Sequence, residues 1–154
     1  MYLRVVLLTM LVLPVGCTAW EHWVLPDVAL PALMLKWFVG WSVGARLFLA
    51  GVRQYLQPRF TAHEIFGITD EEALPLVREL GVANFAAGVV AVASINFADL
   101  RLAMAIWGAI FYGIAGVRHI MARHRSANEN IAMVSDLFTA VVLVGTLVCL
   151  FVVK

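Results

Sequence analysis

Residues 36–60, KWFVGWSVGARLFLAGVRQYLQPRF, decide the fold, because they form an apolar run long enough to cross a bilayer as a helix. Arg46 stands near the middle of this run, Arg53 follows two helical turns later, and Ser42 precedes Arg46 by one turn. A charged side chain at the bilayer centre costs about 2.5–3.5 kcal/mol on insertion scales, so it needs a partner or a water-filled cavity. We therefore expect one polar stripe of this helix to line the inside of a helix bundle.

Composition indicates an integral membrane protein. Of the 154 residues, 63% are hydrophobic and 14% are charged, whereas a soluble domain carries about 25% charged residues. Membrane lipids are therefore the expected surroundings of the chain. The net charge of +1 and the scatter of basic residues among loops give no reason to expect a nucleic acid as partner.

The apolar runs predict an all-α fold with five transmembrane helices in a single domain over residues 1–154. Residues 1–20 also have the shape of a secretory signal, but we interpret them as an additional N-terminal helix. The remaining helices, expected to form a four-helix bundle, cover residues 31–57, 77–97, 102–121 and 128–153. Pro58 ends the second helix, and the capping box from Ser126 to Glu129 opens the last.

Residues 59–74, RFTAHEIFGITDEEAL, form a polar connection that is long for a compact bundle. We favour an amphipathic segment on the membrane surface, with Ile65, Phe66 and Ile68 in the headgroup region, over a functional loop. The capping-box spacing from Thr69 to Glu72 predicts that a helix begins near Asp70.

Lysine and arginine are distributed unequally between the two ends of the predicted helices. By the positive-inside rule, this places the N-terminus in the cytoplasm and the C-terminus outside. The residues counted on the cytoplasmic side are Arg4, Arg53, Arg59, Arg78, Arg118, Arg123 and Arg125, against Lys36, Arg101 and Lys154 on the other side.

Polar side chains from four predicted helices gather in the cytoplasmic half of the bundle, which makes this region the candidate ligand-binding site. Two arginines and two carboxylates balance in sign, as a low-dielectric interior requires. A salt-bridged clasp that only fixes helix register, and a ligand or proton site, both fit this pattern. The residues are Arg46, Arg53, Glu79, Asn84, Tyr112, His119 and Asp136.

Other kinds of site find little support in the sequence. No CxxC or HxxxH spacing suggests a metal, and no cofactor is evident. A Ser/His/Asp triad from Ser135, His119 and Asp136 is rejected, because adjacent residues point to different faces of one helix. For Cys17 and Cys149, buried free thiols are favoured over a disulfide between the first and last helices.

Gly40 and Gly44 form a GxxxG step, which allows another helix to approach closely. The partner helix can belong to the same chain or to a second copy, so a homo-oligomer through this step is one expectation. In either case this face is expected to pack on a helix rather than to hold a ligand.

Several motifs resemble those of DoxX-like membrane proteins, over roughly residues 36–152. Residues 44–51, GARLFLAG, resemble the R-L-x-x-x-G signature of their first core helix. Residues 79–88 resemble the E-x-x-x-G pattern of the second core helix, and residues 112–119 resemble the third. The segments KWFVGWSVGARLFLAGVRQ, FTAHEIFGI, RELGVAN, FYGIAGVRH and NENIAMVSDLF also resemble a small uncharacterised prokaryotic membrane family of about this length.

The resemblance implies a four-helix bundle in the cytoplasmic (inner) membrane of a prokaryote. Some DoxX-like proteins are associated with thiosulfate or quinone-linked oxidation or with redox-stress complexes, so it also implies a quinone-like ligand or a membrane redox partner. This chain has no cysteine pair and no haem-type histidine pair with which to carry electrons itself.

Our leading functional hypothesis is an accessory membrane protein that holds a small lipophilic molecule, quinone-like or lipid-like. Arg46 would orient the polar end of this ligand, with Asn84, Tyr112 and His119 nearby. The alternative is a membrane enzyme in which His119 and Glu79 or Asp136 move protons. A small transporter or proton path is a third and weaker alternative. The leading hypothesis fails if the helices close on Arg46 without a cavity.

Overall fold

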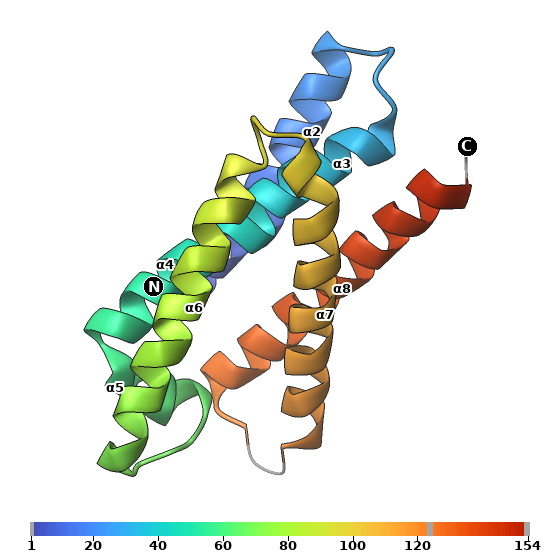
Figure 1. Cartoon of the computed structure of the whole chain (residues 1–154). Coiled ribbons are helices and arrows are strands. Elements are labelled where there is room, and N and C mark those ends of the chain that lie inside the picture. Colours follow the sequence, from blue (N-terminus) through green and yellow to red (C-terminus); the bar gives the residue numbers. More distant parts are fainter. Residues whose placement is uncertain (1, 123–124, 153–154) are drawn as a thin grey trace.

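The computed structural model describes residues 2–122 and 125–152, and all of the regular secondary structure in this part of the chain is helical (Figure 1). Arg123 and Lys154, which enter the count of charges by side, and residue 153 of the last predicted helix lie outside the described residues. Five stretches are long and apolar enough to span a membrane, which confirms the predicted all-α, multi-pass architecture. These stretches are Tyr2–Val24, Leu30–Leu56, Glu71–Ala93, Asp99–Met121 and Ala127–Val152.

Two of these stretches are interrupted by π-helical turns. The first consists of α1 (Tyr2–Leu7), the π-helical η1 (Leu8–Val12) and α2 (Leu13–Val24). The second consists of α3 (Leu30–Phe38), the π-helical η2 (Val39–Ala45) and α4 (Arg46–Leu56).

The other three stretches are simpler. A short 3₁₀ helix, η4 (Glu71–Ala73), leads into α6 (Leu74–Ala93), and α7 (Asp99–Met121) and α8 (Ala127–Val152) follow. The third stretch thus begins before the predicted residue 77. Pro75 lies in the first turn of α6, where its missing N–H disrupts no helical hydrogen bond, so it opens this helix.

Glycines bring α6 into backbone contact with the second stretch. A Cβ atom on Gly88 would lie 2.4 Å from the Phe48 nitrogen, and one on Gly51 would lie 2.4 Å from the Phe85 nitrogen. Gly44 likewise lies against the backbone of Val92. Only glycine allows such an approach, so α6 packs on α4 and η2 along most of its length.

The predicted GxxxG step is therefore covered within the chain. Gly44 faces Val92, and a Cβ atom on Gly40 would lie 2.6 Å from the Ile95 side chain. Self-association through this step stays a prediction, and it would have to compete with α6 for the same face.

The helices α7 and α8 form a second closely packed pair. A Cβ atom on Gly116 of α7 would lie 2.7 Å from the Leu137 side chain of α8. The two pairs meet in an apolar core that includes Val43 and Leu143, both fully buried. In Figure 1, α6 and α7 are close at the tight turn that joins them and diverge toward the opposite end of the molecule.

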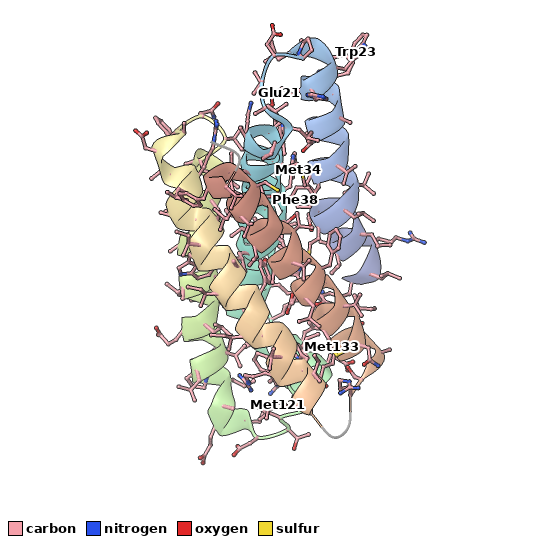
Figure 2. The ribbon with its side chains drawn as sticks, turned by 90° about the vertical axis from the view of Figure 1, so that its right-hand side faces the viewer. Glu21, Trp23, Met34, Phe38, Met121 and Met133 are labelled. Atoms are coloured by element: carbon pink, nitrogen blue, oxygen red, sulfur yellow. The ribbon has the colours of Figure 1, made fainter. Side chains whose placement is uncertain are left out.

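The first stretch is fixed to the second at the end of the molecule where α2 ends. The Glu21 carboxylate accepts hydrogen bonds from Lys36 Nζ at 2.6 and 2.9 Å and from Trp37 Nε1 at 2.5 Å. Figure 2 shows Glu21 and Trp23 at this end and Met121 at the other, with Phe38 between them. The Phe38 ring packs against Phe138 of α8, with ring centroids 6.4 Å apart. Cys17 and Cys149 are both free, so the disulfide alternative is not formed, but Cys17 is half-buried and Cys149 is exposed, so their predicted burial is wrong.

The connection between the second and third stretches is largely helical. It contains α5 (Pro58–Phe60) and the π-helical η3 (Thr61–Ile65). Ile65 is only 8% exposed, so its predicted position in the headgroups is wrong, whereas Phe66 and Ile68 are exposed. Asp70 caps the next helix by accepting a hydrogen bond from the Glu72 nitrogen, as the predicted helix start near Asp70 requires.

We expect the substitution Gly88→Ala to lower the thermal unfolding temperature in detergent by several degrees. The added methyl group would push α6 away from Phe48, and overpacking of this kind costs about 1–3 kcal/mol. Gly145→Ala is the matched control, because a Cβ at Gly145 meets nothing within 4 Å and alanine favours a helix. Equal unfolding temperatures for the two variants would contradict the backbone contact.

Candidate functional site

A cavity of about 1060 Å³ lies at the end of the bundle where α4 and α7 end and α8 begins. Ligand pockets in proteins typically enclose about 300–1,000 Å³, so this one is large enough for a small molecule. Most of its lining side chains are apolar, among them Leu47, Ile65 and Trp107. Ile110 and Ile114 of α7 also line it and are 57% and 61% exposed, so the cavity opens on an apolar side of the molecule.

Arg46 lies on the wall of this cavity, at the first position of α4. Its Nη2 atom donates a hydrogen bond of 2.9 Å to the Tyr2 hydroxyl, and its guanidinium lies over the Tyr2 ring, 5.4 Å from the centroid. The Nε atom of Arg46 is buried and has no hydrogen-bond partner in the part of the chain that the structure describes. A tyrosine of the first stretch, rather than a carboxylate, therefore contacts the arginine, and the buried Nε atom is left without a partner among the described residues.

The π-helical turn before Arg46 explains how α7 is joined to this region. The backbone N–H of Arg46 donates to the carbonyls of Trp41 and Val43. The Ser42 carbonyl, the usual acceptor in an α-helix, instead accepts a 2.8 Å hydrogen bond from the buried Tyr112 hydroxyl of α7. The role of this turn was not predictable from the residues, because no local motif marks it.

Asp136 of α8 lies on the same cavity wall and is 7% exposed. It neither accepts a hydrogen bond nor forms an ion pair with any residue that the structure describes. The ion pairs found within residues 2–122 and 125–152 are Lys36–Glu21, Arg59–Glu71 and His119–Glu129. The salt-bridged clasp of two arginines with Glu79 and Asp136 is therefore not formed, although Arg46 and Asp136 share one cavity.

Two further predicted residues, Arg53 and Asn84, also line the cavity. The Arg53 guanidinium stacks over the Phe60 ring, 3.4 Å from its centroid. The Asn84 amide donates a 2.8 Å hydrogen bond to Gln54 Oε1, and both of these residues are buried. Sequence reasoning missed Gln54, although its place one residue after Arg53 could have drawn attention to it.

Glu79 does not belong to the cluster, which corrects its assignment as a site residue. Its side chain is exposed and does not line the cavity. Asn84 lies five positions after Glu79, and at about 100° per residue the two side chains are about 140° apart around α6. The two side chains therefore point in different directions.

His119 lies at the cavity wall, but the carboxyl group beside it is that of Glu129 rather than Glu79 or Asp136. Its Nδ1 atom lies 3.0 Å from Glu129 Oε1, which joins the last turn of α7 to the first turn of α8. The predicted capping box is confirmed in part, because the Glu129 nitrogen donates to Ser126 Oγ at 3.0 Å. The Glu129 side chain pairs with His119 instead of completing the box.

The connection between α4 and α6 lines one side of the cavity through Thr61, Ile65, Phe66 and Ile68. Ser126 Oγ donates a 2.5 Å hydrogen bond to the Glu64 carbonyl, which holds this connection against the start of α8. Within the described residues, no group of three or more His, Cys, Asp or Glu side chains could hold a metal ion. The site is therefore a set of polar side chains in an apolar cavity.

A model of the Family of unknown function (DUF6790) matches residues 3–153 of the chain. The chain belongs to this family. The expectation of an uncharacterised membrane family is thereby confirmed, whereas the match carries no sign of a relationship between DUF6790 and DoxX-like proteins. No curated protein and no solved structure matches the chain. For this DUF6790 member, functional inference therefore rests on the cavity and its residues.

We expect the substitution Tyr112→Phe to destabilise the protein by about 1–3 kcal/mol. It would leave the Ser42 carbonyl without a partner in an apolar interior, which costs about that much. Tyr55→Phe removes the same hydroxyl from a side chain that is 55% exposed, so it should change stability little. Denaturation in mixed detergent micelles would compare the two variants, and similar stabilities would contradict a structural role for the Tyr112 hydrogen bond.

Proposed function

We propose that this protein binds a small lipophilic molecule, quinone-like or lipid-like, in the cavity between α4, α7 and α8. It would act as a binding or accessory protein in the membrane. The observation that carries this proposal is the cationic side chain of Arg46 on the wall of an apolar cavity that opens to the outside, where no carboxylate of the described residues forms an ion pair with it.

The chemistry of the wall supports a ligand with one polar end. The guanidinium of Arg46 has more N–H groups than the one that donates to Tyr2, and a hydrogen bond from a charged donor to an oxygen atom of a ligand contributes about 1.5–3 kcal/mol. Tyr112 and Asn84 already donate to Ser42 and Gln54, so they shape the wall and leave the arginines as its cationic donors. The apolar side chains around it suit a hydrocarbon tail or ring.

The sequence also favours a location of the protein in the membrane and an orientation of its N-terminus. The distribution of arginines supports a cytoplasmic N-terminus, with the cavity in the cytoplasmic half of a prokaryotic inner membrane. The likeness of residues 44–51 to the DoxX-like signature, which includes Arg46, favours a quinone-linked role and a redox partner in the membrane.

An enzyme that performs acid/base or redox chemistry on the same molecule is the second candidate. The favouring observation is the His119–Glu129 pair at the cavity wall, because a histidine oriented by a carboxylate is a common general acid or base in enzymes. In that case His119→Gln would abolish turnover but leave ligand binding largely unchanged.

We expect Arg46→Gln to weaken binding of decylubiquinone, a short-chain quinone, by at least about 10-fold. Loss of a hydrogen bond from a charged donor costs about 1.5–3 kcal/mol, and 1.4 kcal/mol corresponds to one decade. Quenching of tryptophan fluorescence would report binding, because Trp107 lines the cavity.

The control is Arg78→Gln, since Arg78 is exposed and does not line this cavity. Thermal unfolding of each variant would separate loss of binding from loss of fold, and Arg46→Lys preserves the charge if the glutamine variant is unstable. Equal affinities for the Arg46 and Arg78 variants would remove the ground for the proposed function.

A further inference from the structure

We propose that the ligand of this cavity carries both a hydrogen-bond acceptor and a cationic donor at its polar end, as the zwitterionic head of an aminophospholipid does. Its phosphate would accept from Arg46, and its ammonium group would donate to Asp136. This inference rests on the proposed function and narrows the chemical class of the ligand.

Two groups of opposite charge share the cavity without touching. The guanidinium of Arg46 has the Tyr2 hydroxyl as its hydrogen-bond partner, and the carboxyl oxygens of Asp136 accept no hydrogen bond from the described residues. Charges in an apolar interior are stabilised by direct hydrogen bonds more than by attraction across a gap. The two side chains do not form an ion pair with each other, so one occupant with both functions would satisfy both.

Several other polar side chains of the wall have partners. Tyr2 accepts from Arg46, the Arg53 guanidinium stacks on Phe60, and His119 pairs with Glu129. Asn84 and Tyr112 are likewise engaged in hydrogen bonds. Arg118 also lines the cavity, but it is exposed near the end of α7. Arg46 and Asp136 are therefore the two groups of opposite charge that lie on the wall away from its exposed end, on helices that are distant in the sequence.

The shape of the cavity suits an amphiphile that arrives from the membrane. Arg46 and Asp136 lie on the cavity wall, while the exposed Ile110 and Ile114 mark the open side next to α7. Acyl chains could therefore remain in the lipid phase while the head enters, and the cavity need not enclose the whole molecule. Arginine binds phosphate oxygens well, and a carboxylate binds an ammonium group.

Native mass spectrometry of the delipidated full chain in a neutral maltoside detergent would test the inference. The probes are dioleoyl-phosphatidylethanolamine, which carries an ammonium group, and dioleoyl-phosphatidylglycerol, which does not. We expect the wild-type protein to bind the first about 10-fold more tightly. Asp136→Asn should abolish this preference while retaining binding of both lipids, and Arg46→Gln should weaken both.

One control changes a side chain outside the Arg46–Asp136 pair, and the other keeps the carboxyl group at position 136. Glu79→Gln should leave both affinities unchanged, because Glu79 is exposed and does not line the cavity. Asp136→Glu retains a carboxyl group and should therefore retain the preference for the phosphatidylethanolamine. If Asp136→Asn does not fold, the lipid preferences of the wild type and of Asp136→Glu test the inference instead.

The outcomes separate this inference from the proposed function. Equal binding of the two lipids by the wild type, or a preference that survives Asp136→Asn, would overturn the zwitterionic class. The proposed function would still stand if decylubiquinone or either lipid lost affinity on Arg46→Gln. Absence of binding for all three probes, or affinities that do not change on Arg46→Gln, would overturn both.

Discussion

Backbone contact between α6 and the second membrane-spanning stretch is the constraint on which the structure depends. Two glycines on each helix make this contact, spaced seven residues apart: Gly44 and Gly51 on the second stretch, and Gly81 and Gly88 on α6. Because seven residues are about two helical turns, the contact repeats along the same face of each helix. This pair of helices and the pair α7–α8 share an apolar core, and α6 and α7 diverge away from the tight turn that joins them (Figure 1). The cavity lies toward the end of the bundle where α4 and α7 end, lined by residues of both pairs.

The position of Arg46 follows from the same arrangement. The face of α4 that carries the arginine lines the cavity, where the side chain forms no ion pair with a carboxylate of the described residues. Tyr2 contacts one side of the guanidinium through its hydroxyl and its ring, and the cavity leaves the other side unmatched. A charged side chain that is held in place but lacks some of its hydrogen bonds suits a binding protein, because the ligand can supply the missing hydrogen bond.

The sequence predicted those features that follow from local composition or from short spacing. Five apolar runs specify five helices, and both Asp70 and Ser126 cap helices near their predicted positions, since capping depends on residues only two or three apart. The cavity residues Arg46 and Asp136 were also identified, because a charge within an apolar run is conspicuous in any sequence.

The partners of those residues could not be predicted. Tyr2 lies 44 positions before Arg46, and nothing local links the two. Glu129 was assigned to its own capping box, although its side chain reaches α7. The assignment of Glu79 failed because two residues on one helix were grouped without regard to the angle between them. Which side chains pair between helices depends on how each helix is rotated about its own axis and shifted along it relative to its neighbours. The pattern of apolar residues defines this rotation and shift poorly when every helix is apolar on several sides.

The π-helical segment η2 gives the second stretch room for one change of length. A π turn holds about one residue more than an α turn, so deleting one residue between Val39 and Ala45 would restore a regular α-helix. The two halves would keep nearly their present rotation relative to each other, because the π turn already absorbs the extra residue. Lys36 would stay beside Glu21 and Arg46 on the cavity wall, whereas a deletion within the regular helix α4 would turn its two parts by about 100° relative to each other. Members of this family should therefore tolerate the loss of one residue in η2 and not in α4.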